Sequence, residues 1–375
     1  MIYFDNSATG GKKPDSVYQS VFNAIKYLSV NAGRSAHRQA IVAEEYLYKT
    51  RKLLAEFFGA DKCERVIFTK NCTEALNLAI FGLVQKGSNV VTTCFEHNSV
   101  LRPLLHLKNK GEISLTIVKP KGDVILENDI ERALSPNTRL VCVTGASNVT
   151  GEINDYEAIG ALLQKKDITF LLDGAQVAGH AEINMRRHGI DVLCISGHKG
   201  LDAIQGVGAL IFNRKTNILP TQFGGSGTES FSAEPSGYPE KLECGTLNLP
   251  AIISLLEGVL YNKENFKSKQ VLLLKLTAKL ILGLESIDGV KIYSRKNPIG
   301  IVSFSYKDYS SQEVAGILSE RFDIAVRGGY HCAPLMHEFL KTSANGLVRA
   351  SLSEWNTEQE IDYFIYALKK LPEYL

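Results

Sequence analysis

A lysine that directly follows a short apolar run is the residue of this sequence best suited to covalent chemistry. Lys199 ends the segment 191–199, in which the apolar run breaks at Gly197 and is followed by His198. Such runs are typical of buried strands, and the carboxyl ends of strands in α/β sheets carry functional groups. Burial lowers the pKa of a lysine, and only the neutral amine attacks a carbonyl to form a Schiff base. The alternative is an ordinary surface lysine, so the interpretation depends on the rest of the chain.

A carboxylate stands in the same kind of position after the apolar run 168–172. Asp173 begins the motif 173–176, Asp-Gly-Ala-Gln. An aspartate there can cap a helix, bind a metal or pair with a buried cation. We expect no metal site, because no His, Cys or Glu stands nearby at ligand spacing. A pair of Lys199 and Asp173 is typical of Schiff-base cofactor sites, where the carboxylate favours a protonated pyridine nitrogen.

Three more polar residues follow predicted strands. Thr73 opens a predicted helix, and helix-start amides bind phosphate, although a threonine followed by Glu74 is also an ordinary helix start. His97 is suited to stack on a planar ring or to act as a structural histidine. Asn148 can donate to a ring hydroxyl or belong to a plain turn.

A cysteine in a glycine-flanked segment is a candidate nucleophile. Cys332 follows His331 in the segment 326–334, Val-Arg-Gly-Gly-Tyr-His-Cys-Ala-Pro. Glycine permits backbone turns that expose a side chain, and an exposed thiol near a cation becomes a nucleophilic thiolate. The alternative is a buried packing residue, as most free cysteines are.

The elements that must position these residues alternate between strand-like and helix-like patterns from about residue 44 to 215. The short apolar strands are 65–69, 89–93, 140–144 and 168–172. This alternation predicts an α/β fold with a mostly parallel central sheet covered by helices. Because parallel strands end at one edge of a sheet, we expect the polar residues that follow them to face one crevice.

A chain of 375 residues is long enough for two domains. A long helical pattern covers about 250–282, and shorter strands with helices between them follow. We therefore expect a large domain over 16–255 and a smaller α+β domain over 256–375, to which residues 1–15 add. The glycine- and serine-rich stretch 223–239 is predicted to be a long loop, and such loops are commonly functional.

The composition is that of an ordinary enzyme, with 45% hydrophobic residues, 22% charged residues and a formal charge of +2. It favours neither a disordered chain nor a nucleic-acid partner. We expect neither a secretory signal nor a membrane span. The seven cysteines are widely spaced with no C-x-x-C pair, which indicates reduced thiols and a cytoplasmic location.

Taken together, the motifs resemble those of the pyridoxal-phosphate enzymes of aminotransferase class V. Within that class the chain resembles the cysteine desulfurases, and its Arg-x-Gly-x-x-Cys segment is similar to that of their second, selenocysteine-lyase-like group. The motifs are residues 3–9, 73–77, 147–151, 173–176, 196–199 and 349–351. They span nearly the whole chain. The resemblance implies the fold type I of pyridoxal-phosphate-dependent transferases, with a smaller C-terminal domain.

The resemblance also implies a role for each residue toward the cofactor. Lys199 would hold pyridoxal 5'-phosphate as a Schiff base, Asp173 would pair with the pyridine nitrogen, and His97 would stack on the ring as a catalytic residue. The residues that would address the ring hydroxyl region are Asn148 and Gln176. The residues that would bind the phosphate are Thr73, Ser196, His198 and, through its amide, Cys72. In this family a Gly-Thr pair of the neighbouring subunit completes the phosphate site, so Gly245 and Thr246 imply a homodimer.

For the substrate, the resemblance implies that Arg349 clamps the α-carboxylate of L-cysteine with help from Asn148. Arg327 would assist or order the loop. Cys332 would attack the substrate sulfur, so that alanine leaves and a persulfide passes to an acceptor protein for iron-sulfur or thio-cofactor assembly. The alternatives are a selenocysteine lyase, a class V aminotransferase in which Cys332 is incidental, and a cofactor-binding protein without turnover.

Three segments depart from the family pattern. Asn71 and Cys72 stand where small or hydroxyl residues are common, and Tyr330 replaces a common histidine. The segment 200–206, directly after the lysine, lacks the usual proline. These departures bear on loop geometry and rate more than on the type of reaction.

Overall fold

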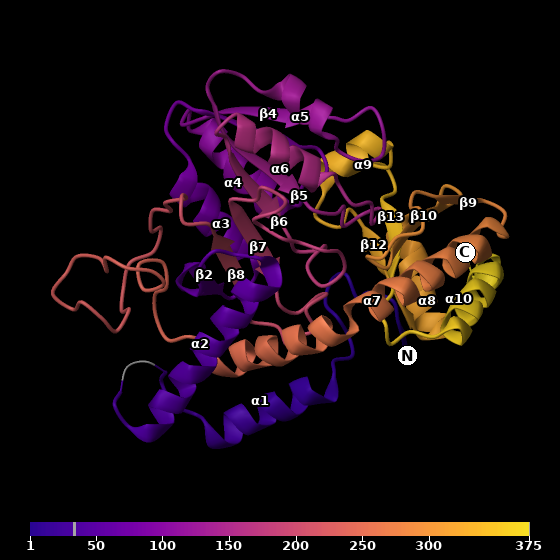
Figure 1. Ribbon diagram of the computed structural model, residues 1–375. Coiled ribbons are helices and arrows are strands. Elements are labelled where there is room, and N and C mark those ends of the chain that lie inside the picture. Colours follow the sequence, from indigo (N-terminus) through magenta and orange to yellow (C-terminus); the bar gives the residue numbers. More distant parts are fainter. Residues whose placement is uncertain (33–34, 375) are drawn as a thin grey trace.

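The computed structural model describes residues 1–32 and 35–374, so residue 375 of the expected small domain lies outside it. At its centre is a seven-stranded sheet (Figure 1). In spatial order its strands are β2 (Val66–Thr69), β8 (Gly208–Phe212), β7 (Val192–Ser196), β6 (Thr169–Asp173), β5 (Thr138–Thr144), β3 (Asn89–Thr93) and β4 (Ser114–Val118). Only β8 runs against its neighbours β2 and β7. The predicted α/β fold with a mostly parallel sheet is confirmed.

The sequences of the strands are largely unbroken apolar runs, because helices cover both faces of the sheet. Successive side chains of β5 point to opposite faces, so Leu140 and Cys142 join one core while Val141 and Val143 join the other. One face is covered by α3 (Cys72–Leu83) and α4 (Asn98–Asn109). The other is covered by α2 (Arg38–Phe58), α5 (Glu127–Ala133), α6 (Tyr156–Lys165) and the first part of α7 (Leu249–Glu285).

A second sheet lies at the far end of α7, to the right in Figure 1. It is antiparallel, in the order β12 (Arg327–Gly329), β13 (Leu347–Ser351), β10 (Ile301–Tyr306) and β9 (Val290–Ile292). The helices α8 (Ser311–Phe322) and α10 (Glu358–Lys370) pack on this sheet, whereas α9 (Pro334–Leu340) packs against the core of the large sheet. The N-terminal β1 (Ile2–Tyr3) pairs with β11 (Ile324–Ala325) beside this sheet. The expected boundary at 255 falls inside α7, which runs on without a break, and the division into domains stays a prediction.

Two segments lie outside the layers that cover the large sheet. The helix α1 (Asp15–Tyr27) packs along α7 together with α2. Residues 213–248, between β8 and α7, form no helix or strand in the described chain, and the middle of this segment projects from the body at the left of Figure 1. The long loop predicted over 223–239 belongs to this segment.

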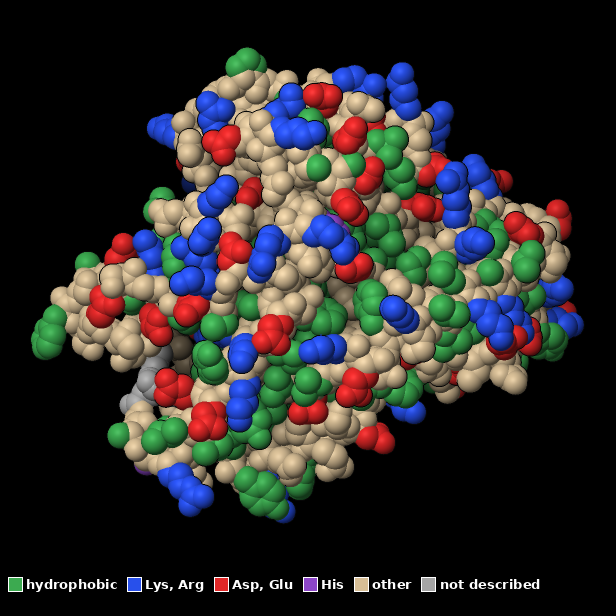
Figure 2. All heavy atoms as spheres, in the orientation of Figure 1, with side chains coloured by type: hydrophobic (Ala, Val, Ile, Leu, Met, Phe, Trp, Pro, Cys, Tyr) green, Lys and Arg blue, Asp and Glu red, His purple; other side chains and the backbone are tan. Residues whose placement is uncertain are grey.

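The molecular surface carries both signs of charge. Basic and acidic side chains are interspersed over the face shown in Figure 2. Among the described residues, no helix combines the length and apolar character that a bilayer crossing needs.

Candidate active site

Nine of the predicted site residues line one cavity of about 80 Å³ at the carboxyl edge of the central sheet. They are Cys72, Thr73, His97, Asn148, Asp173, Gln176, Ser196, His198 and Lys199. They are scattered over more than a third of the chain, but the strands that precede them end at the same edge. This convergence is the consequence of parallel strand order.

Lys199 and Asp173 come from neighbouring strands, since Asp173 pairs in register with Cys194 of β7. Burial lowers the pKa of Lys199, although attraction to Asp173 opposes the shift. Burial likewise raises the pKa of Asp173, against the attraction of Lys199 and a hydrogen bond from the Ala175 amide. The amine is thereby brought closer to its reactive neutral form, and the buried carboxylate would be stabilised by a cationic ring nitrogen.

The turn between β2 and α3 forms another wall of the cavity. Asn71 caps α3, because its side-chain oxygen accepts a hydrogen bond from the Glu74 amide at 2.9 Å. Gly208 of β8 lets the turn approach closely, since a Cβ there would lie 2.7 Å from the carbonyl carbon of Asn71. The first amides of α3 lack partners within the helix and suit an anion. The thiol of Cys72 donates to Asp173 at 3.5 Å, and burial raises the pKa of this thiol well above its usual value.

His97 is held in one orientation by Ser99. The His97 Nδ1 accepts from the Ser99 amide at 3.0 Å, and the Ser99 hydroxyl lies 2.8 Å from Nδ1 and 2.7 Å from the hydroxyl of Thr73. Burial and the charge of Lys199 lower the pKa of His97 to about 4. The ring is therefore neutral at pH 7 with its proton on Nε2, and a neutral ring can stack without the cost of burying a charge.

His198 is neutral for the same reason. Burial and the charges of Lys199 and Lys13 lower its pKa to about 4. Its Nδ1 lies 3.0 Å from the hydroxyl of Thr9. As a neutral ring, His198 can hydrogen-bond to a phosphate.

Cys332 lies at the open side of this cavity in a fixed loop. It lines a hollow of about 600 Å³ that shares Thr73, His97 and Ser99 with the cavity of Lys199. The Asn98 amide donates to the carbonyl of Cys332 at 2.8 Å. His331 and Cys332 have φ of 50° and 58°, a left-handed conformation that non-glycine residues adopt only under constraint.

Asn148 connects this loop to Arg349. Its side-chain nitrogen donates to the carbonyl of His331 at 2.6 Å, and its own carbonyl accepts from Arg349 Nη1 at 3.0 Å. The side-chain amide of Asn148, which we predicted to contact the cofactor, thus donates a hydrogen bond that holds the loop of Cys332. Its proposed contact with the ring hydroxyl stays a prediction.

The two arginines lie side by side on paired strands, because Arg327 of β12 faces Arg349 of β13. Arg349 is 1% exposed and forms an ion pair with Asp5 at 3.0 Å. Its buried Nε has no hydrogen-bond partner among the described residues, so the guanidinium retains a donor for a ligand. Arg327 Nη2 instead lies 3.8 Å from the sulfur of Cys332, where it would face a thiolate.

The predicted pair Gly245 and Thr246 lies away from the cavity of Lys199. Thr246 lines a separate cavity with Phe68 and Thr69 and does not line the cavity of Lys199. Its segment is anchored by Glu243, which forms a buried ion pair with Arg51 at 2.7 Å. In one subunit Thr246 is therefore not placed to complete the site.

The residues present fit pyridoxal phosphate. The buried Oε1 of Gln176 lacks a hydrogen-bond partner among the described residues, while its Nε2 donates to the carbonyl of Ser7 at 3.1 Å. A ring hydroxyl would satisfy this acceptor, Asp173 would satisfy a ring nitrogen, and the start of α3 would satisfy a phosphate.

Sequence reasoning missed Asp5, Thr9 and Ser99 as site residues. All three belong to segments that it had noticed, the motif 3–9 and the run after His97. No local sequence pattern indicates that Asp5 pairs with Arg349, because 344 positions separate them.

Comparisons with known proteins identify the family of the chain. Residues 2–364 match the family described as "Aminotransferase class-V". The chain is 33% identical to a "Probable cysteine desulfurase" of Methanothermobacter thermautotrophicus, over 99% of this chain and 94% of that protein. It is 31% identical to a "Probable cysteine desulfurase" of Borreliella burgdorferi, over 99% and 92%. Among solved structures, the apo cysteine desulfurase of Thermococcus onnurineus NA1 superposes with a TM-score of 0.91 at 31% identity, covering 100% of this chain and 95% of that one.

Proposed function

The chain belongs to the class V aminotransferase family and, within it, to the cysteine desulfurases, and we propose that it converts L-cysteine to L-alanine with a persulfide on Cys332. The observation that carries this proposal is the joint placement of three groups. Lys199 and Asp173 line one cavity, and Cys332 lies at its open side in a loop held by Asn98 and Asn148.

Each residue near the cavity has a task that suits its surroundings. Pyridoxal phosphate, when bound, withdraws electrons from the Cα–H bond of an amino acid. Lys199, whose pKa is lowered by burial, would take a proton from the substrate Cα and return it. Arg349 would bind the α-carboxylate through its free Nε, while Asp5 holds the other side of the guanidinium.

The sulfur transfer needs no outside oxidant. The sulfur of Cys332 attacks the substrate sulfur, the Cβ–S bond breaks and an S–S bond forms. L-cysteine and the Cys332 thiol thereby give L-alanine and the Cys332 persulfide. The transferred sulfur is oxidised while Cβ is reduced to a methyl group, which takes up a proton. The nearby guanidinium of Arg327 would stabilise the attacking thiolate.

Measuring alanine release from L-cysteine and from selenocysteine tests this function directly. We expect alanine from L-cysteine without any added 2-oxo acid, because the amino group stays on the product. A strict need for a 2-oxo acid would instead indicate an aminotransferase. Alanine from selenocysteine alone would indicate a selenocysteine lyase. Binding of the cofactor without any product would indicate a protein that has lost turnover.

We also propose that the working unit is a homodimer that passes sulfur to an acceptor protein in the cytoplasm. Large apolar side chains of α1 and α2 are exposed in the single chain. They are Tyr18, Phe22, Ile25, Tyr27, Ile41, Val42 and Tyr48. Apolar surface of this kind appears over these helices in the lower part of Figure 2, and burial against a second copy would remove it from water. The position of Thr246 outside the cavity supports the same arrangement.

Mixing two inactive variants tests whether Thr246 serves the partner's site. Thr246→Asp places a carboxylate beside the phosphate, and Lys199→Ala removes the amine, so each homodimer is expected to be inactive. Mixed dimers would hold one intact site, so equal mixing should restore about a quarter of the wild-type rate if subunits assort at random. The matched control mixes Lys199→Ala with Cys332→Ala, which belong to the same subunit's site and should not complement. No recovery in the first mixture, with mixed dimers present, would refute the assignment of Thr246.

A further inference from the structure

Lys199 is flanked by His198 and Gly200, and the carbonyl group of each of these two residues accepts a hydrogen bond from a buried lysine. Lys13 Nζ donates to the carbonyl of His198 at 2.9 Å, and Lys269 Nζ donates to the carbonyl of Gly200 at 2.9 Å. Lys13 is 5% exposed and Lys269 is 3% exposed. Lysines are rarely buried this deeply unless they are paired, so we expect opposite charges close to both ammonium groups.

Two buried carboxylates balance these two ammonium groups. Lys269 Nζ lies 3.1 Å from Asp202 and 3.2 Å from Glu354, and Asp202 and Glu354 also attract Lys13. Burial would lower the pKa of Lys269, but the attraction of Asp202 and Glu354 outweighs it and raises this pKa. Lys269 therefore remains charged at neutral pH. We call these four residues, Lys13, Asp202, Lys269 and Glu354, the charge cluster.

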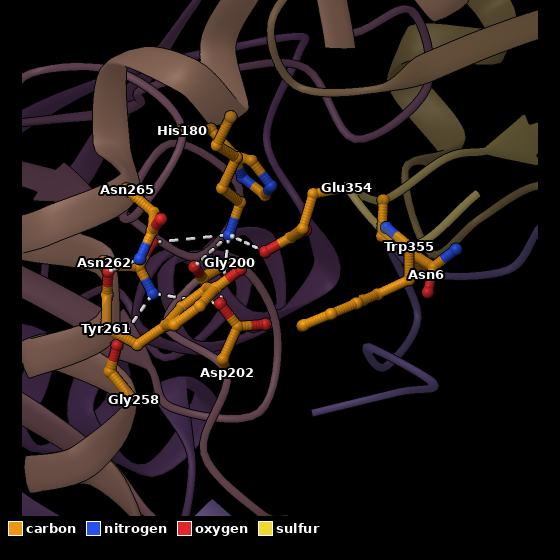
Figure 3. A network of polar contacts seen from close by, with 12 residues as sticks. Asn6, His180, Gly200, Asp202, Gly258, Tyr261, Asn262, Asn265, Glu354 and Trp355 are labelled. Carbon is orange, nitrogen blue, oxygen red and sulfur yellow. Dashed lines mark hydrogen bonds and ion pairs between the residues drawn. The ribbon is translucent and has the colours of Figure 1, made fainter. Parts of the chain in front are cut away.

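Three members of the charge cluster, Asp202, Lys269 and Glu354, join three parts of the chain. Figure 3 shows Asp202 and Glu354 in this network of polar contacts. Asp202 belongs to the turn that follows Lys199 and has φ of 58°, Lys269 belongs to α7, and Glu354 follows β13, which carries Arg349. Asn262 of α7 reinforces the junction, since its side-chain nitrogen donates to Asp202 at 2.9 Å and its oxygen accepts from Lys269 at 3.3 Å.

The helix α7 approaches the turn closely enough for this contact because of Gly258. A Cβ at that position would lie 2.1 Å from the carbonyl of Leu201, so no other residue fits without movement. The segment 200–206 is the one that lacks the proline usual in the family. In this structure Lys269 contacts the turn at two points, the carbonyl of Gly200 and the carboxylate of Asp202.

We propose that Lys269 is a positioning residue for catalysis, which holds the turn of Lys199 in a fixed relation to the strand of Arg349. The inference rests on the proposed role of Lys199 and extends it. The lysine acts through the carbonyl of Gly200 and the carboxylates of Asp202 and Glu354, and it does not line the cavity itself. It would keep the amine that handles the Cα proton aligned with the group that binds the carboxylate.

The competing explanation is that the charge cluster only stabilises the fold. A variant that leaves one partner of a buried ion pair alone is destabilised, whatever its catalytic role. The test must therefore measure properties of the Lys199 turn that general destabilisation leaves unchanged.

The variant Lys269→Met removes the ammonium and keeps the length of the side chain. In the cofactor-loaded protein, we expect hydrogen exchange of the amides in 197–206 to become about tenfold faster or more, while β6 is unaffected. We expect kcat for alanine formation to fall about 100-fold with little change in KM, since misplacing a reacting group costs rate. Lys269→Arg retains donors for the same carbonyl and carboxylates and should recover much of the loss.

The matched control is Lys279→Met. Lys279 lies on the same helix and joins it to α10 through ion pairs with Glu358 and Asp362, but it is far along α7 from the turn. This variant should leave both exchange in 197–206 and kcat unchanged. If Lys269→Met lowers the melting temperature but behaves like the control in local exchange and kcat, the proposal is refuted.

A charge-neutral variant covers the case in which Lys269→Met does not fold. Lys269→Met with Asp202→Asn removes one charge of each sign and leaves the carboxylate of Glu354 to balance Lys13. Asparagine also tolerates the left-handed backbone at position 202. The same exchange and kcat results are expected and the same outcomes apply. The exchange measurement does not depend on desulfuration, so it still tests the proposal if the wild-type protein releases no alanine from L-cysteine.

Discussion

Cys332→Ala is expected to abolish the conversion of L-cysteine to L-alanine, with a loss of at least about 10³-fold in rate. The reason is that no other group would be aligned to attack the substrate sulfur. A positioned nucleophile replaces an encounter with a thiol from solution, and that advantage disappears with the side chain. The loop itself should stay in place, because the Asn98 amide binds the backbone of Cys332 and Asn148 binds the carbonyl of His331. Alanine and cysteine are equally strained at φ of 58°.

Two measurements check this expectation. Alanine release is compared in the wild type and the variant, and the protein mass after one turnover shows whether one sulfur atom has been added. The matched control is Cys63→Ala, which removes another half-buried free thiol outside the cavity. Cofactor binding should be unchanged in both variants. Full alanine release by Cys332→Ala would contradict the persulfide step, and an added sulfur on another cysteine would assign it elsewhere.

The second large effect is expected for Lys199. Replacing Lys199 with alanine removes the amine that we propose attaches the cofactor and moves the Cα proton, so turnover should fall about 10⁴-fold or more. Lys199→Arg should be just as inactive. A guanidinium stays protonated and cannot attack a carbonyl, whereas burial lowers the pKa of the lysine amine.

Reduction with borohydride followed by peptide mass spectrometry identifies the lysine that holds the cofactor. The label is expected on Lys199 in the wild type and should be missing in Lys199→Ala. Lys70→Ala serves as the control, because Lys70 is an exposed lysine beside the start of α3 and should not change the labelling. A label on any other lysine of the wild type would overturn the assignment.

The sequence predicted the central elements and most of the cavity because these depend on local patterns. Buried parallel strands appear as short apolar runs, and the residues that follow them must meet at one edge. That rule predicted that Thr73, His97, Asp173 and Lys199 lie together, and all four line the cavity. The antiparallel direction of β8 carried no such signal, since its apolar run resembles those of its parallel neighbours.

These local patterns do not predict contacts between segments that are distant in the sequence. The pairing of Asp5 with Arg349 depends on how the N-terminal segment docks beside β13. The position of Cys332 depends on Asn98 at the start of α4 and on Asn148 in the turn after β5. The same holds for Lys269, which in the sequence is one of many lysines on an amphipathic helix.

The amino-acid sequence by itself determined that a lysine, an aspartate and a helix start meet at one sheet edge, because the short apolar runs show where the strands end. Only the tertiary structure decided what surrounds those groups. It placed Cys332 at the open side of the cavity, left Thr246 outside it, and set two buried lysines against the carbonyls that flank Lys199. The physical reason is that pKa shifts and hydrogen bonds depend on distance in space, which the order of residues does not contain.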